Sequence, residues 1–220
     1  MQNNIIIAAT TNEHKIIEIS AITEKFGFTV VSRAAAGVPD FEIEENGTTF
    51  KENSFIKAKV IMDYTGKPTI SDDSGLIVDA LDGAPGVYSA RYAIKEADIL
   101  DFENAEKNPA IRSPQDKANN EKLLRMLKDV PFEKRTARFV SVITLLSPSN
   151  EPIICRGEVE GHVAFEQTGD NGFGYDPMFI PLGFDETFGT IPSDIKNKIS
   201  HRYNALVKLK EKLSTEGLTL

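Results

Sequence analysis

Three short groups of polar residues, far apart in the sequence, carry the side chains best suited to chemistry. The first lies at residues 10–15, after an apolar run, and offers hydroxyls, an amide and a lysine. The second is the acidic pair Asp72 and Asp73, which offers two adjacent carboxylates to a metal and a water. The third joins a glycine-rich aromatic segment at residues 172–177 to a Ser-His-Arg sequence at residues 200–202. These groups favour phosphate, a divalent cation and a nucleobase, respectively.

The first group lies between a predicted buried strand and a predicted helix. The unpaired N–H groups and the positive dipole at the start of a helix favour an anion. The hydroxyls of Thr10 and Thr11, the amide of Asn12 and the ammonium group of Lys15 would together bind a triphosphate. Taken alone, the group favours simple helix capping by Thr11 or Asn12, with Lys15 solvated. It is not a Walker A loop, because G-x-x-x-x-G-K-[ST] is absent.

The acidic pair follows a predicted strand and precedes Ser74 and Gly75. We therefore predict that it projects at a strand end, where sites of α/β proteins form. Carboxylate oxygens suit Mg²⁺, and one carboxylate can hold the metal while it helps to remove a proton from an attacking water. A plain turn over residues 72–75 is at least as compatible with these residues. Further ligand candidates, which can also be a solvated charge run, are Glu42, Glu44 and Glu45.

The third group contains two aromatic residues, Phe173 and Tyr175, among glycines. Aromatic faces stack on bases, and glycines let backbone N–H groups approach the edge of a base. Asp176 can accept a hydrogen bond from a base N–H, and Arg202 can donate one to a base carbonyl. Alternatively, both aromatic residues fill the core and Arg202 starts a helix; this group alone leaves the two interpretations open.

The elements that must position these groups alternate between strands and helices, which is typical of an α/β fold. The helix after Thr49 has capping-box spacing and should end at Gly66. Residues 94–112 are polar and irregular, and we interpret them as an insertion with a short helix. We predict strands at residues 5–9, 28–32, 69–71, 139–146 and 153–163, the last two antiparallel, and helices at 13–26, 50–65, 114–127 and 200–213.

Composition predicts a soluble globular protein with a single domain over residues 1–220. The chain has 40% hydrophobic and 26% charged residues. Its net charge of -8 argues against binding to long duplex nucleic acid. The single cysteine, Cys155, excludes an internal disulfide and fits a reducing compartment. No targeting segment is visible and no run approaches the roughly 18 apolar residues of a membrane span, so we predict a cytoplasmic location.

Six motifs, in order, closely resemble those of the inosine/xanthosine triphosphate pyrophosphatase family, also called HAM1-like. They cover nearly the whole chain and are T-x-N-x-x-K (10–15), E-x-x-G-x-T-F-x-E-N (44–53), D-D-S-G-L (72–76), G-A-P-G-x-Y-S-A-R-Y (83–92), G-F-G-Y-D-P (172–177) and K-N-x-x-S-H-R (196–202). The resemblance implies Mg²⁺-dependent hydrolysis of ITP, dITP and XTP to the monophosphate and pyrophosphate, with Mn²⁺ as a possible substitute. It also implies a long mixed sheet flanked by helices, a cleft between two lobes, and a homodimer.

The resemblance also implies a role for each matching residue. Asp73 would be the proton acceptor and a metal ligand, and Glu44 the second metal carboxylate, with Glu45 as the neighbouring alternative. The implied substrate-binding residues are Thr10, Thr11, Asn12, Glu13, His14 and Lys15 for the triphosphate, Lys57, Ser74 and Lys196 for phosphate or sugar, and Phe173, Gly174, Tyr175, Asp176, His201 and Arg202 for the base.

Two features depart from the family pattern, and two other functions stay open. Thr11 stands where the family usually has glycine. The segment at residues 95–112 is longer than is common in the family, and we place this insertion at the rim of the site. The alternatives are a nucleotide-binding module without turnover and a Maf-type hydrolase of modified pyrimidine nucleotides. A panel of triphosphates, scored for pyrophosphate or phosphate release, separates the three functions.

Overall fold

The structure is a computed structural model that describes residues 5–93 and 114–215. The insertion predicted over residues 94–112 lies outside these residues. Contacts group the chain into two compact units. Unit 1 comprises Met1–Ser74, Val140–Glu158 and Ile199–Leu220, and unit 2 comprises Gly75–Phe139 and Val159–Lys198. A single domain over the whole chain therefore stays a prediction, as does a cleft between two lobes.

Six strands form one mixed sheet in the order β2-β1-β3-β4-β5-β6. The central pairings in unit 1 are parallel, because β1 (Ile5–Ala8) pairs with both β2 (Thr29–Ser32) and β3 (Thr69–Val78). At the other edge, β5 (Asn150–Val163) pairs antiparallel with β6 (Phe179–Pro181). The remaining strand, β4 (Thr136–Ser147), lies between β3 and β5. The predicted α/β class with a mixed sheet and flanking helices is confirmed.

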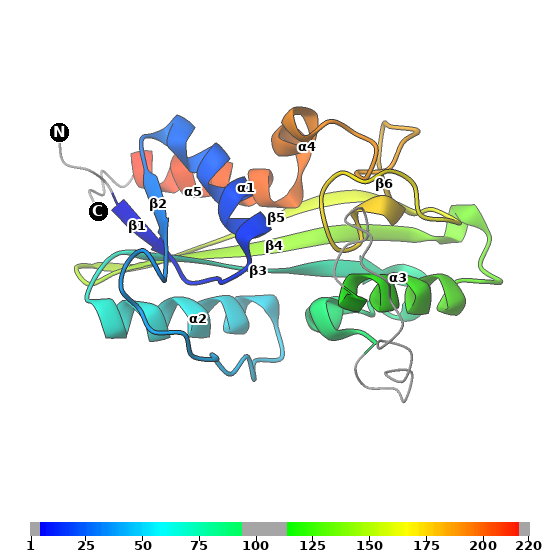
Figure 1. Cartoon of the computed structure of the whole chain (residues 1–220). Coiled ribbons are helices and arrows are strands. Elements are labelled where there is room, and N and C mark those ends of the chain that lie inside the picture. Colours follow the sequence, from blue (N-terminus) through cyan, green and yellow to red (C-terminus); the bar gives the residue numbers. More distant parts are fainter. Residues whose placement is uncertain (1–4, 94–113, 216–220) are drawn as a thin grey trace. The chain divides into compact units, whose positions relative to one another are not determined.

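Helices cover both faces of the sheet in unit 1 (Figure 1). On one face lie α1 (Glu13–Thr23) and α5 (His201–Thr215), and on the other lies α2 (Phe50–Thr65). Successive side chains of a strand point to opposite faces, so β1 contributes to both layers. Ile6 packs in one cluster with Ile19 of α1 and Leu206 of α5, whereas Ile7 packs in a second cluster with Ile61 of α2.

Local signals set the ends of the two N-terminal helices. The capping box predicted at Thr49 is present, with reciprocal hydrogen bonds between Thr49 and Glu52. Gly66 ends α2 with a φ of 64°, in the left-handed region that glycine adopts at low cost. After α1, a 3₁₀ turn at Glu24–Phe26 leads to Gly27, where φ is 85°. The sequence therefore predicted both helices correctly, except that the last turn of the first is 3₁₀.

Unit 2 has its own apolar core, which contains three phenylalanine rings in contact. The ring of Phe179 lies 4.7 Å from that of Phe139 and 5.4 Å from that of Phe188, measured between centroids. Its longest helix is α3 (Pro114–Met126), as predicted, while β6 and α4 (Ser193–Ile199) were not predicted. None of the helices in the described residues combines the length and hydrophobicity needed to cross a bilayer. Short 3₁₀ segments cover Asp79–Leu81, Gly86–Arg91, Phe132–Lys134 and Asp176–Met178.

The main departure from the sequence prediction is the course of β3. The strand predicted to stop at residue 71 continues to Val78, so the acidic pair lies inside a strand and not in a turn or at a strand end. Asp72 is 0% exposed and Asp73 is 7% exposed. The turn preference of an Asp-Asp-Ser-Gly sequence is overridden because β1 and β4 flank β3 and because cations pair with both carboxylates.

Candidate functional site

The two adjacent aspartates of β3 point to opposite faces of the sheet. Asp72 contacts Lys15 of α1, whereas Asp73 contacts Lys57 of α2. This separation follows from the two-residue repeat of a strand, which puts neighbouring side chains on different faces. The expectation that both carboxylates would serve one metal and one water is therefore wrong, because each has its own set of partners.

Asp72 is the centre of a buried network in unit 1. Its Oδ2 lies 2.7 Å from Lys15 Nζ and accepts hydrogen bonds from Arg202 Nη2 and Ser74 Oγ, both at 3.0 Å. Its Oδ1 accepts a hydrogen bond from Ser141 Oγ at 2.5 Å. Burial alone would raise the pKa of Asp72, but Arg202 and Lys15 outweigh it and hold that pKa well below its ordinary value. Asp72 is therefore a carboxylate at neutral pH.

Arg202 is held by two carboxylates on one face of unit 1. Its guanidinium contacts Glu18 of α1 in addition to Asp72, and the residue is 0% exposed. Burial lowers its pKa, but the two carboxylates outweigh this effect and raise it. The predicted contact of Arg202 with a base stays a prediction, as does that of its buried neighbour His201.

Asp73 forms a separate ion-pair group on the α2 face. Lys57 Nζ lies 2.8 Å from Asp73 Oδ1 and 2.8 Å from Glu45 Oε2. The other oxygen, Asp73 Oδ2, is buried and has no hydrogen-bond partner among the described residues. Burial raises the pKa of Asp73, and Lys57 and Lys15 offset only part of this shift. The carboxylate is thus more basic than an ordinary aspartate and has one acceptor to spare.

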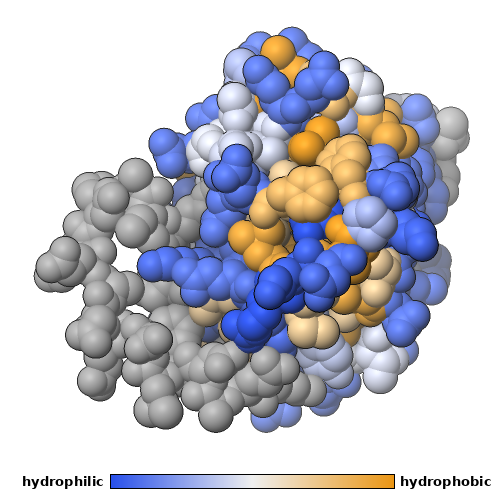
Figure 2. Space-filling model, turned by 90° about the vertical axis from the view of Figure 1, so that its right-hand side faces the viewer, coloured by the Kyte–Doolittle hydropathy of each residue, from blue (hydrophilic) through white to orange (hydrophobic). Residues whose placement is uncertain are grey.

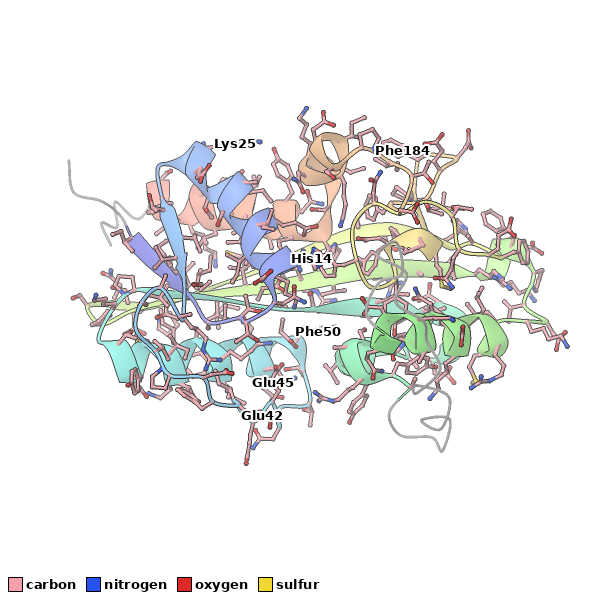
Figure 3. All side chains as sticks on the ribbon, viewed as in Figure 1. His14, Lys25, Glu42, Glu45, Phe50 and Phe184 are labelled. Carbon is pink, nitrogen blue, oxygen red and sulfur yellow. The ribbon has the colours of Figure 1, made fainter. Side chains whose placement is uncertain are left out.

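The carboxylate linked to Asp73 through Lys57 belongs to Glu45 and not to Glu44. Residues 41–45 alternate, so that Phe41 and Ile43 pack against the cluster of Ile7 while Glu42 and Glu44 are exposed. Glu45 follows the inward positions and lies beside the first turn of α2 (Figure 3). The structure thus favours the alternative that the sequence left open.

The residues around Asp73 Oδ2 fit a divalent cation. A buried carboxylate oxygen without a hydrogen-bond partner can accept a metal ion, and oxygen-only ligands suit Mg²⁺ or Mn²⁺. No group of three or more potential protein ligands occurs in residues 5–93 and 114–215. Mg²⁺ takes one or two protein carboxylates and completes its shell with water and phosphate oxygens.

The residues at the start of α1 cap the helix. Asn12 is the N-cap, and its Oδ1 accepts a hydrogen bond from the Lys15 N–H at 3.2 Å. The Asn12 N–H in turn donates to Thr10 Oγ1 at 3.1 Å. The capping interpretation is therefore correct for Asn12, but Lys15 is not solvated, since it pairs with Asp72. Phosphate binding by this group stays a prediction for all six residues, of which Thr11, Asn12, Glu13 and His14 are exposed.

In unit 2, a buried ion pair closes the glycine-rich loop. Lys196 Nζ lies 2.7 Å from Asp176 Oδ2, and both side chains are almost fully buried. The same oxygen accepts the Phe173 N–H at 2.7 Å, and the Lys196 ammonium lies 5.2 Å from the centroid of the Phe173 ring. Asp176 and Lys196, predicted to contact base and phosphate, thus hold the loop together here.

The two aromatic residues of this loop have different surroundings. Tyr175 is 5% exposed, and its hydroxyl donates to the Ser89 carbonyl at 2.9 Å. Burial raises the pKa of this hydroxyl, which therefore stays protonated. Phe173 is half-buried. The core interpretation is therefore correct for Tyr175, whereas stacking of Phe173 on a base stays a prediction.

Sequence reasoning missed several residues of these networks. Glu18 lies in no motif, although it follows Lys15 by three positions and so shares its face of α1. Ser141 lies in an apolar strand, where a lone serine gives no signal. In unit 2, Asp116 and Asn120 of α3 contact Gly174 of the loop.

Comparisons with known proteins show the family to which the chain belongs. A sequence model of the Ham1 family matches residues 6–212. A dITP/XTP pyrophosphatase of Halalkalibacterium halodurans is 44% identical over 204 residues, 92% of this chain and 95% of the relative. One of Geobacter sulfurreducens is 44% identical over 214 residues, 97% and 98% of the two chains. The solved structure of the Staphylococcus aureus Ham1 protein matches with a TM-score of 0.77 and 37% identity over 96% of this chain and 99% of that one. The chain belongs to the Ham1 family.

Proposed function

We propose that this protein hydrolyses noncanonical purine nucleoside triphosphates, namely dITP, ITP and XTP, to the monophosphate and pyrophosphate. Relatives that align over almost the whole chain are named dITP/XTP pyrophosphatases. The observation that carries the proposal is the environment of the two carboxylate oxygens of Asp73. Its Oδ1 is fixed by Lys57, while its Oδ2 is buried without a hydrogen-bond partner among the described residues.

Asp73 is proposed as the proton acceptor. A general base works best when its pKa lies nearer the working pH than that of a free carboxyl, and burial raises the pKa of Asp73. Lys57 restricts the carboxylate to one orientation and keeps it ionised. Lys57 and Lys15 would also stabilise the negative charge that develops on the leaving pyrophosphate.

Asp73 and Glu45 are proposed to hold Mg²⁺, with Mn²⁺ as a substitute. When bound, the cation would neutralise phosphate charge and lower the pKa of a coordinated water. Glu45 replaces Glu44 in this role because Lys57 joins its carboxylate to that of Asp73.

The start of α1 and the glycine-rich loop are proposed to bind different parts of the substrate. The start of α1, from Thr10 to Lys15, is proposed to bind the triphosphate, because a helix N-terminus favours an anion. The face of Phe173 is proposed to stack on the base. Hydrogen-bond donors toward the 6-oxo group would reject adenine, since its amine leaves such donors unpaired; discrimination of this kind reaches about 10⁴.

The decisive test is a panel of triphosphates scored for the product released. We expect Mg²⁺-dependent pyrophosphate release from dITP, ITP and XTP, a much lower rate with ATP, and collapse of the activity in Asp73→Asn. Asp79→Asn is the matched control, because Asp79 also pairs with a cation but is exposed. Tight binding of ITP without product would instead establish a binding module. A preference for modified pyrimidine nucleotides would establish the Maf-type activity.

We also propose that the protein is a cytoplasmic homodimer that uses an apolar face of unit 2. Apolar residues gather at the centre of one face, surrounded by hydrophilic ones (Figure 2). The exposed apolar residues of unit 2 include Phe132 and Phe165, which are 41% and 59% exposed and whose ring centroids lie 6.1 Å apart, and a second copy could cover them. Sedimentation should show a dimer that Phe165→Glu weakens; a dimer unaffected by this change would refute the use of this face.

A further inference from the structure

One helix of unit 2 holds both polar groups of a single loop residue. Asp116 and Asn120 are one turn apart on α3 and therefore share a face. The Gly174 N–H donates to Asp116 Oδ2 at 3.3 Å, and Asn120 Nδ2 donates to the Gly174 carbonyl at 3.0 Å. Gly174 has a φ of 58°, a conformation that a residue with a side chain rarely adopts. The backbone next to Phe173 is thus fixed from outside the loop.

The same helix also holds the segment that contains the hydrogen-bond acceptor of Tyr175. Asn119 Nδ2 donates to the carbonyls of Ser89 and Ala90, each at 3.2 Å. The Ser89 carbonyl is also the acceptor for the Tyr175 hydroxyl. Asn120 therefore holds Gly174 directly, and its neighbour Asn119 holds the carbonyl that accepts the Tyr175 hydroxyl. Gly174 and Tyr175 are consecutive residues of the loop.

The position of Asn120 points to a role for its amide nitrogen. Asn120 is 1% exposed, and its Nδ2 donates to Gln167 Oε1 at 3.1 Å as well as to Gly174. Its Oδ1 is buried and has no hydrogen-bond partner in the described part of the chain. A buried acceptor without a partner is unfavourable, so an apolar residue of similar size would suit stability better. The two donated hydrogen bonds explain why an amide occupies this site.

We infer that α3 is a positioning element for base recognition, in which Asp116 and Asn120 fix the Gly174 backbone and through it the orientation of the Phe173 ring. This inference rests on the proposed function, in which Phe173 stacks on the base. Asp116 and Asn120 are positioning residues that do not touch the substrate. Both act by keeping the loop in one conformation before the nucleotide binds, which reduces the cost of ordering the loop on binding.

Two variants separate base recognition from phosphate binding. Asn120→Asp replaces the donating nitrogen by oxygen, and Asp116→Ala removes the carboxylate oxygen that accepts the Gly174 N–H. We expect each to raise KM for ITP by about tenfold, equivalent to about 1.4 kcal/mol, and to reduce the preference for ITP over ATP by a similar factor. Inorganic tripolyphosphate has no base, so its inhibition constant should stay within about twofold of the wild-type value. Lys117→Gln, an exposed change on the same helix, should alter none of these quantities.

The outcomes distinguish this inference from the proposed function. If the wild-type protein does not release pyrophosphate from ITP, the proposed function fails first. If it does, and both variants keep the wild-type KM and preference, the inference is refuted. Equal losses toward ITP and tripolyphosphate would also refute it, because α3 would then support the whole site. Asp116 is only half-buried, so Asp116→Ala still gives a result if Asn120→Asp does not fold.

Discussion

Replacing Asp72 by asparagine tests whether the buried network of unit 1 depends on charge. The substitution keeps the shape of the side chain but removes the negative charge that faces Lys15 and Arg202. Arg202 would retain Glu18 as its other carboxylate partner. The amide nitrogen of the new side chain would also be a donor in a site where four donors converge on the wild-type carboxylate.

The structure sets the size of the expected loss. Removing one partner of a buried ion pair costs about 3–5 kcal/mol, because the remaining charge stays buried. Arg202 is fully buried and cannot reach water, whereas the Lys15 side chain is 16% exposed and can turn toward solvent. We therefore expect the lower end, about 3 kcal/mol. For a chain of this size, about 2–4 °C per kcal/mol gives a decrease in Tm of about 6–12 °C.

Thermal unfolding of the wild-type protein and Asp72→Asn at several pH values checks this reasoning. The folded pKa of Asp72 is lowered, so its stabilisation is complete above the ordinary value of 3.8 and is lost as pH falls through the folded pKa. The difference in Tm should therefore be large at pH 7 and should narrow in acid. Asp79→Asn, whose exposed pair contributes at most about 1 kcal/mol, is the control. A decrease no larger than that of the control at pH 7, or a difference that does not narrow in acid, would refute the argument.

Three further changes test other parts of the structure. Lys57→Met removes a cation that lowers the pKa of Asp73, so the rise of kcat/KM with pH should move to higher pH; an unchanged pH profile would contradict Asp73 as the base. Glu45→Gln should weaken the apparent affinity for Mg²⁺ by at least about tenfold in a titration of activity, whereas Glu44→Gln should not, and the reverse result would return the role to Glu44. Thr49→Ala should destabilise the protein by about 1 kcal/mol in urea unfolding, because α2 loses its N-cap; an unchanged midpoint would mean that water replaces the cap.

The parts of the fold that the sequence predicted are those set by local signals. The capping box at Thr49, the glycine stop at Gly66 and the buried strand at Ile5–Ala8 all depend on residues within a few positions of one another. The course of β3 depends instead on β1 and β4, which are distant in sequence. A window of sequence around Asp72 cannot show that cations from α1 and α5 make an extended, buried conformation favourable there.

The candidate site was predictable as a set of residue types but not as a set of pairs. The sequence identified Lys15, Lys57 and Asp73, yet it gave no means to tell which cation meets which carboxylate. That assignment depends on the face of β3 to which each aspartate points. The sequence left two interpretations open for Tyr175 for a related reason, because an aromatic residue next to glycine has the same pattern whether its ring is buried or open.

The opposite orientations of Asp72 and Asp73 make the length of β3 critical. Inserting or deleting one residue just before the pair would turn each carboxylate toward the helices that now face its neighbour. Arg202 would then face Asp73 and Lys57 would face Asp72, although the composition of the chain would hardly change. A shift of one position in β3 therefore changes both ion-pair networks at once, whereas exchanging one of its residues leaves the alternation intact.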